Sequence, residues 1–176
     1  AGIDEINTHG ISNFSIRRVA TACDVSCAAP YRHFKDKDEL ILEIIRYIFS
    51  KWTLLSREIE AIYSADPERL VAELAAANIA FWVANGNFRS VLMTEAGDDD
   101  LEGARAELQR FDAPIISAVA VLAEAKGYGD ERRAELEFLV TSLIYGSVML
   151  IATGKIRDTA TAVKRVRATL KRELST

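Results

Sequence analysis

The amino-acid sequence predicts an all-α protein in which an N-terminal three-helix unit with a helix-turn-helix precedes a larger helical body. Apolar residues recur at helical spacing along most of the 176 residues, and alternating polar and apolar runs, typical of strands, are not prominent. Proline, which interrupts helices, occurs three times, at Pro30, Pro67 and Pro114. Near the N-terminus, two short helical patterns flank a tight turn, the layout of helix-turn-helix proteins that read DNA.

The first of these short helices is predicted to begin after Ser15, a favourable N-cap residue, and to end near Cys23. Ile16 and Ala20 fall on the same helical face as Cys23, so we expect Cys23 to pack against the rest of the unit. The chain should then reverse at Asp24, because aspartate tolerates a left-handed backbone better than most residues do.

The second short helix should be the one that reads DNA. Val25 is expected to fill the angle between the two helices, and Ser26 is a candidate N-cap for about two helical turns over residues 27–34. Pro30 falls inside this segment and lacks the NH of one intrahelical bond, so the helix should start later or bend there. Asp36, followed three residues later by a glutamate, predicts the start of a third helix.

Tyr31, His33, Phe34 and Lys37 stand in a Y-x-H-F-x-x-K arrangement within the sequence YRHFKDKDEL. This segment resembles the DNA-binding domain of the TetR family of bacterial transcriptional regulators. The preceding SIRRVATACDVS is similar to the second helix and turn of that family. AGIDEINTHG resembles the end of the family's first helix, so we expect the first helix to be truncated in this sequence. The sequence departs from the family pattern in having Asp24 where glycine is usual, a proline in the reading helix and an apolar stretch before it.

The resemblance implies two domains and a regulatory function. Residues 1–47 should form the DNA-binding domain, and residues 48–176 should form a helical ligand-binding and dimerisation domain. The family expectation is a ligand-responsive repressor that binds a near-palindromic DNA operator as a homodimer and is released by an unidentified small molecule. Two reading helices about 34 Å apart would face successive turns of the duplex. The alternative is a helical small-molecule carrier or interaction protein that has lost specific DNA binding.

Physical roles can be assigned to residues of the candidate DNA-reading surface. Arg17 and Arg32 can each donate two hydrogen bonds to guanine, whereas the other basic side chains and the hydroxyls suit phosphates. Cys27 and Ala28 offer mainly apolar contact, for example to a thymine methyl group. The alternative is that His33 and Phe34 pack the three-helix unit while the charges form a solvated face. The residues predicted to contact DNA are Ser15, Arg17, Arg18, Ser26, Cys27, Ala28, Tyr31, Arg32, His33, Lys35 and Lys37.

Charge is segregated along the chain. The net charge of −4 argues against a protein that binds nucleic acid indiscriminately. Residues 15–37 carry five basic and two acidic side chains, a local charge of +3, whereas residues 38–154 carry ten basic and twenty acidic ones, a local charge of −10. A basic reader on an acidic body suits a site-specific regulator, and a solvated acidic surface is an equally sufficient explanation of the body.

Several classes of protein are disfavoured by the sequence. Cys23 and Cys27 are too few and wrongly spaced for a zinc site or a disulfide framework, and no metal or other cofactor is expected. Phosphate-binding loops, nucleophile elbows and metal-ligand clusters are lacking, so we do not expect an enzyme. No apolar run reaches about 18 residues and the N-terminus lacks the layout of a secretion signal, which predicts a cytoplasmic protein without a membrane partner.

The body is predicted to contain five or six helices. The longest, over residues 37–63, should bury an apolar face that includes Leu40, Ile44, Ile48, Leu55 and Ile59. Further helices are expected over residues 68–84, 88–94, 101–126, 131–153 and 159–174. The helix over residues 131–153 is apolar on most sides after its first turns, and such a helix must be covered all round.

Two functional sites are expected in the body. The residues that could line an apolar effector pocket are Phe81, Trp82, Phe88, Met93, Phe111, Tyr145 and Met149. The last two helices resemble the pair through which TetR-family subunits dimerise, and the candidate interface residues are Phe138, Leu139, Ser142, Tyr145, Gly146, Met149, Val163, Val166 and Leu170. Packing within the core of a single subunit is the alternative for both sets.

Overall fold

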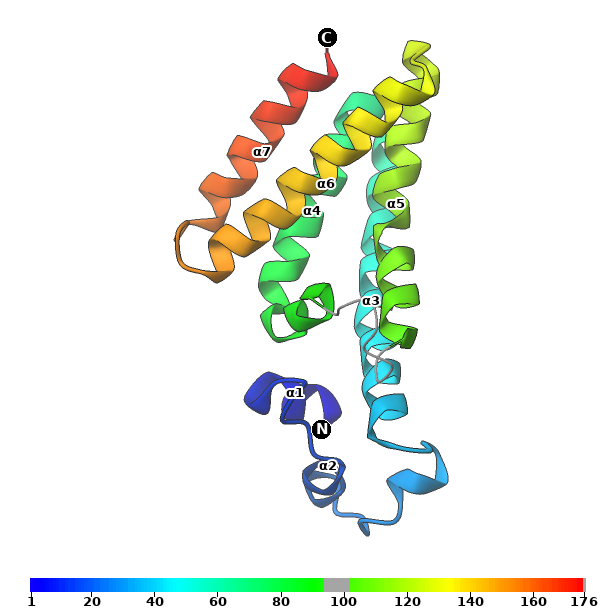
Figure 1. Cartoon of the computed structure of the whole chain (residues 1–176), viewed down its shortest axis with the longest axis vertical. Helices are drawn as coiled ribbons and strands as arrows, with labels where there is room; N and C mark the ends of the chain where they lie inside the picture. The colour runs from blue at the N-terminus through cyan, green and yellow to red at the C-terminus, as the bar shows by residue number, and fades with distance from the viewer. Residues whose placement is uncertain (94–101, 176) are drawn as a thin grey trace. The chain divides into compact units, whose positions relative to one another are not determined.

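The structure, a computed structural model, describes residues 1–93 and 102–175 of the chain (Figure 1). The described residues form α-helices and short 3-10 helices and contain no strand, which confirms the all-α fold class. In chain order the elements are α1 (Gly2–His9), α2 (Ile16–Ala22), η1 (Pro30–Arg32), α3 (Lys37–Tyr63), α4 (Pro67–Ala84), η2 (Gly86–Met93), α5 (Glu102–Lys126), α6 (Asp130–Ala152) and α7 (Thr159–Leu174).

The chain divides into two compact units. Ala1–Lys51 and Asn87–Gln109 make up the first unit, and Trp52–Gly86 and Arg110–Thr176 make up the second. The first unit therefore holds the segment predicted to bind DNA together with a later stretch of chain. The predicted domain division between residues 47 and 48 stays a prediction.

Local sequence signals delimit the N-terminal helices. α1 ends at Gly10, whose φ of 75° lies in the left-handed region that glycine adopts without strain. Ser15 caps α2 as predicted, because its side chain accepts a hydrogen bond from the NH of Arg18 at 3.4 Å. Asp24 follows α2 with a φ of 53° and is the one non-glycine residue with a positive φ in the described part of the chain. The predicted chain reversal at Asp24 is therefore confirmed.

The segment after this turn is not the regular helix that the sequence predicts over residues 27–34. It consists of turns and one short 3-10 helix, η1. Pro30 cannot donate an NH to the carbonyl of Ser26, so an α-helical bond is lost at that point. The backbone closes instead by tighter bonds, such as the one from the NH of His33 to the carbonyl oxygen of Pro30 at 3.0 Å.

Two packing predictions around the turn are also wrong. Cys23 is exposed rather than packed, and Val25 keeps 47% of its surface exposed instead of filling the angle between helices. Ile16 and Ala20, from the same predicted face, are buried as expected. The reason is that α2 ends at Ala22, so the residues that follow no longer continue its buried face.

α3 begins where the sequence predicts. Asp36 Oδ1 accepts hydrogen bonds from the NH of Asp38 at 3.1 Å and the NH of Glu39 at 2.9 Å, and the Glu39 carboxylate accepts one from the NH of Lys35. These bonds satisfy NH groups that a helix start leaves without an intrahelical partner. The Asp36 start therefore fixes where the exposed Lys37 enters the helix.

The buried face of α3 follows the prediction in its first half and departs from it in its second half. Leu40, Ile44 and Ile48 are buried as expected. Leu55 is exposed and Ile59 is half-buried, whereas Trp52 and Ser56 are fully buried. The contacts of Trp52 with aromatic side chains on other helices explain this change.

In the second unit, α4 packs against α6 and α7, and α6 also contacts α7 (Figure 1). Asp66 caps α4 by accepting a hydrogen bond from the NH of Arg69 at 3.1 Å, and Pro67 occupies the first helical position as predicted. Asp158 caps α7 as predicted by accepting one from the NH of Ala160 at 3.0 Å.

Four aromatic side chains of the second unit contact one another, and we call Trp52, Phe81, Trp82 and Phe111 the aromatic cluster. The ring centroid of Phe111 lies 4.8 Å from Trp82, 5.3 Å from Trp52 and 5.4 Å from Phe81. Trp52 Nε1 also donates a hydrogen bond to the carbonyl oxygen of Phe111 at 2.8 Å. These separations are typical of favourable aromatic pairs, so the cluster joins α3, α4 and α5 within the unit.

Among the described helices, α6 is long and apolar enough, by length and composition alone, to cross a membrane. A search of the sequence for uninterrupted apolar runs of about 18 residues does not predict this property, because α6 contains no such run. Within the single chain, 22% of its most apolar 18-residue window is buried. Much of the apolar surface of α6 is therefore left uncovered by the other residues that the structure describes.

Candidate DNA-reading surface

Most residues predicted to contact DNA lie at the surface of the first unit. Ser15 is half-buried because it caps α2, and Tyr31 on η1 is 56% exposed. The exposed members of the predicted set are Arg17, Arg18, Ser26, Cys27, Ala28, Tyr31, Arg32, His33, Lys35 and Lys37. We call residues 26–37 the reading segment.

Four exposed basic side chains of this surface are free to meet phosphates. Arg17, Arg32, Lys35 and Lys37 form no ion pair with any other residue that the structure describes. Unpaired cations of this kind attract the DNA backbone and account for most of the salt-dependent part of DNA affinity. The surface can therefore bind DNA electrostatically without first breaking an internal ion pair.

Phe34 is more buried than the other aromatic residues of the reading segment. It is half-buried, its NH donates to the carbonyl oxygen of Pro30 at 3.0 Å, and its ring meets the edge of His33 with centroids 6.4 Å apart. Tyr31 and Arg32 precede Phe34 on η1 and are both exposed. The structure thus places Phe34 in a packing role and leaves Tyr31 and Arg32 accessible to a ligand.

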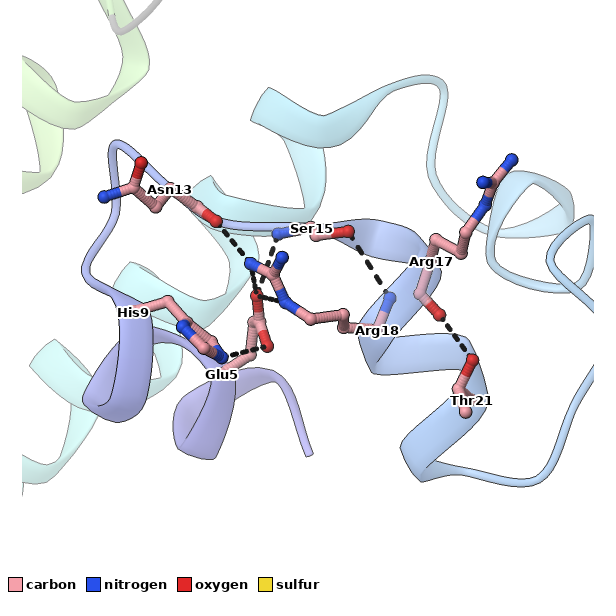
Figure 2. A network of polar contacts seen from close by, with 7 residues as sticks. All are labelled: Glu5, His9, Asn13, Ser15, Arg17, Arg18 and Thr21. Atoms are coloured by element: carbon pink, nitrogen blue, oxygen red, sulfur yellow. Dashed lines mark hydrogen bonds and ion pairs between the residues drawn. The ribbon is translucent and has the colours of Figure 1, made fainter.

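Arg18 differs from the other arginine of α2, because it is held by a network of polar contacts (Figure 2). Its Nε donates to Glu5 Oε1 at 2.8 Å, and its Nη2 donates both to the same oxygen and to the carbonyl oxygen of Asn13 at 2.5 Å. The NH of Ser15 donates to Glu5 Oε1 at 3.1 Å. Figure 2 shows Arg17 directed away from this network. The two neighbouring arginines therefore have different surroundings.

The electrostatics of the network favour an internal role for Arg18. Glu5 is 8% exposed, and its hydrogen bond with Arg18 holds the pKa of the Glu5 carboxyl below its ordinary value. The same bond raises the pKa of the Arg18 guanidinium. Glu5 was not singled out by sequence reasoning, and the signal that could have found it is a carboxylate directly before the apolar Ile6, which is buried.

Replacing Glu5 with glutamine should lower the melting temperature by a few degrees at neutral pH. Because the folded-state pKa of Glu5 lies below its ordinary value of 4.5, the ion pair stabilises the fold above about pH 4.5 and this stabilisation is lost as the pH falls further. Thermal melts of wild type and Glu5→Gln from neutral to acidic pH should therefore converge. Glu58→Gln, on an exposed part of α3, is the control. A difference in melting temperature that does not change with pH would contradict this account.

The predicted effector-pocket residues are only partly brought together. Phe81, Trp82 and Phe111 meet in the aromatic cluster of the second unit, where they are joined by Trp52, which sequence reasoning did not include. The remaining pocket candidates have other surroundings. Phe88 is buried in the first unit, Tyr145 donates to both carboxylate oxygens of Asp112, Met149 is exposed, and the side chain of Met93 lies outside the described part of the structure.

The candidate interface residues of α6 and α7 divide by exposure. Phe138 is 75% exposed, and Ser142, Gly146 and Met149 are exposed on α6 as well. Leu139, Tyr145 and Val163 are half-buried, whereas Val166 and Leu170 are buried within the core of the single chain. The surface available to a second subunit therefore belongs mainly to α6.

Comparison with known proteins identifies the N-terminal region. Residues 1–44 match the model of the bacterial regulatory proteins of the tetR family. Residues 1–44 belong to the TetR family. This match contains the network of Glu5 and Arg18 and all of the exposed basic residues described above. The matched family consists of bacterial regulatory proteins. No curated protein sequence matches the chain significantly.

Solved structures share the TetR fold over nearly the whole chain. A proposed fatty acid metabolism regulator from Clostridium perfringens is 14% identical, with a TM-score of 0.77 over 97% of this chain and 94% of that one. A proposed TetR-family transcriptional regulator from Rhodococcus sp. is 20% identical, with a TM-score of 0.70 over 96% and 92%. The TetR-family transcriptional regulator PfmR from Thermus thermophilus is 18% identical, with a TM-score of 0.65 over 96% and 91%. The chain therefore has the fold of a TetR-family transcriptional regulator.

Proposed function

We propose that this chain is a cytoplasmic, ligand-responsive repressor that binds a near-palindromic operator as a homodimer. The observation that best supports this proposal is the exposed reading segment in a TetR-family domain, with basic side chains that have no ion-pair partner among the described residues. The local charge of −10 over residues 38–154 would repel DNA from the body and favour contact through the reader. Binding of a small molecule in the body would release the operator by favouring another conformation.

Homodimerisation is proposed from the uncovered face of α6. Phe138 is 75% exposed, and it lines an open groove of about 480 Å³ together with residues of α5 and α6. The other lining residues are Ile116, Ala134, Glu137, Thr141, Ser142 and Tyr145. Large exposed apolar side chains on one helix are unfavourable in water, so a second copy of this face would bury them on both subunits.

Replacing Phe138 with aspartate should convert the dimer to a monomer at micromolar concentration. A large aromatic side chain in the middle of an interface typically contributes at least about 2 kcal/mol, so the dimer dissociation constant should rise by roughly 30-fold or more. Analytical ultracentrifugation across a concentration series would measure this change. Leu54→Asp, at a 62% exposed position on α3, is the matched control and should leave the dimer intact. A wild-type protein that is monomeric and binds lipid vesicles through α6 would contradict the dimer.

The effector is proposed to bind in the second unit, near the aromatic cluster. The cluster brings together four aromatic side chains from three helices, and aromatic side chains are the usual lining of a small-molecule site. A ligand could change DNA affinity only by binding the DNA-bound and released conformations with different affinities.

The function can be tested by selecting genomic fragments with the full-length protein and titrating the selected site across salt concentrations. We expect a near-palindrome whose affinity falls steeply with salt, because several phosphate contacts release counterions on binding. If a folded dimer enriches no DNA sequence, the proposed regulatory function is wrong. The carrier or interaction protein would then be favoured, consistent with the irregular backbone around Pro30 in the reading segment.

A further inference from the structure

Asn78 is a fully buried polar side chain in the middle of α4. Its exposed fraction is 0%, and neither its Oδ1 nor its Nδ2 has a hydrogen-bond partner among the described residues. Its neighbours Leu74, Ala75 and Ile79 are apolar and fully buried as well. A buried amide without partners has lost its hydrogen bonds to water, so this position is unfavourable unless another molecule satisfies the amide.

The Asn78 amide borders the aromatic cluster. Phe81 and Trp82 follow Asn78 by three and four residues in α4, so the three side chains share one side of the helix. The rings of Trp82 and Phe111 are 4.8 Å apart, and those of Phe81 and Trp52 are 5.9 Å apart. A molecule held by the Asn78 amide would therefore lie on the side of α4 that carries Phe81 and Trp82.

Ser56 supplies a second polar group at the same end of the cluster. It is 1% exposed, it follows Trp52 by one helical turn in α3, and its hydroxyl donates to the carbonyl oxygen of Thr53 at 3.1 Å. A short turn after Tyr63 joins α3 to α4, so both Ser56 and Asn78 are displaced from the aromatic cluster toward that turn. The Ser56 oxygen can still accept a hydrogen bond.

The charges of the second unit favour a neutral ligand. The buried acids among the described residues, Glu5 and Glu107, both belong to the first unit. Asp112 of the second unit is half-buried, and its two carboxylate oxygens accept from Tyr145 Oη at 2.9 and 2.7 Å. Burial raises the pKa of Asp112 and of Tyr145. A charged ligand beside Asn78 would be buried without a buried counter-ion, which is energetically costly. A neutral ligand needs no counter-ion.

We propose that Asn78 is the recognition group for a neutral, flat effector that carries a hydrogen-bond acceptor beside a donor, as an aromatic carboxamide or lactam does. The Asn78 Nδ2 donates to the ligand carbonyl oxygen and Oδ1 accepts from the ligand NH, which satisfies both atoms of the amide. The ligand ring packs against the aromatic cluster. This inference rests on the proposed ligand-responsive function and adds the chemical class of its effector.

Three probes with the same ring system test this chemistry. Naphthamide carries a neutral amide, naphthoate carries a negative charge, and methylnaphthalene carries only an apolar methyl group. Their dissociation constants can be measured by NMR on the ¹⁵N-labelled full chain, with the side-chain NH₂ of Asn78 as the reporter. Naphthamide should bind at least about tenfold more tightly than the other two and should shift the Asn78 resonances. No binding of naphthamide at millimolar concentration, or tighter binding of either other probe, would overturn the proposal.

Asn78→Leu removes the amide while keeping a side chain of similar size. This variant should melt about 2–4 °C higher than the free wild type, because it no longer buries an unsatisfied amide. It should also bind naphthamide no more tightly than methylnaphthalene. Asn13→Leu, at an exposed position, is the matched control and should change neither result. A lower melting temperature of Asn78→Leu, or a retained preference for naphthamide, would each show that Asn78 is not the recognition group.

Release of the selected operator by naphthamide is measured in a separate assay. Binding that depends on Asn78 and weakens operator affinity in wild type, but not in Asn78→Leu, supports the complete proposal. Binding that depends on Asn78 without any effect on the operator overturns the effector role of this site. If the protein binds no DNA under any condition, the proposed repressor function is wrong. The relative affinities of the three probes, which are measured without DNA, still test whether Asn78 recognises a neutral amide.

Discussion

Replacing Arg32 with alanine is expected to weaken binding of the selected operator by roughly 30-fold or more while leaving the fold intact. Arg32 is exposed on η1 and makes no ion pair with another described residue, so its removal should not change the melting temperature. An arginine that donates two hydrogen bonds to guanine contributes about 1–3 kcal/mol, and a dimer would lose one such contact at each half-site. Fluorescence anisotropy with a labelled operator would measure the dissociation constant.

Two further variants separate base reading from general charge. Arg32→Lys keeps the positive charge but not the planar two-donor geometry, so it should retain attraction to DNA and lose much of the sequence preference. Arg157→Ala removes an exposed arginine between α6 and α7 and should bind the operator as wild type does. Equal operator affinity of wild type and Arg32→Ala would show that Arg32 does not read the operator.

Replacing Trp52 with alanine is expected to destabilise the fold by about 3–5 kcal/mol, the usual cost of removing a buried aromatic side chain. Trp52 is 0% exposed, packs on the rings of Phe81 and Phe111, and donates a hydrogen bond to the Phe111 carbonyl. Alanine leaves a cavity at these contacts and removes the hydrogen bond that Trp52 donates to the Phe111 carbonyl. Urea denaturation would give the change in the free energy of unfolding.

The matched control for Trp52 is phenylalanine, which keeps an aromatic ring but lacks the indole NH. Trp52→Phe should lose clearly less stability than Trp52→Ala, because much of the ring packing remains. A loss below about 1 kcal/mol for Trp52→Ala would mean that the cluster rearranges to fill the cavity. Equal losses in the two variants would instead assign the stabilisation to the hydrogen bond.

The limits of the helices could be predicted because they depend on neighbouring residues. Ser15, Asp66 and Asp158 accept hydrogen bonds from NH groups two or three residues later, and a cap of this kind is readable from a few letters of sequence. Asp24 adopts the left-handed backbone for an equally local reason. The backbone of the reading segment was harder to predict. The loss of one helical hydrogen bond at Pro30 could be foreseen, but the replacement of the whole helix by turns and a short 3-10 helix could not.

The sequence by itself therefore determined the all-α class, most helix limits, the basic character of the reader and its family. Tertiary structure decided which side chains of each helix face remote partners. Arg18 pairs with Glu5, thirteen residues away, and Trp52 rather than Leu55 is buried because Phe81 and Phe111 pack on it. Helical periodicity and caps act within about one turn, whereas burial and ion pairing depend on residues that only folding brings together.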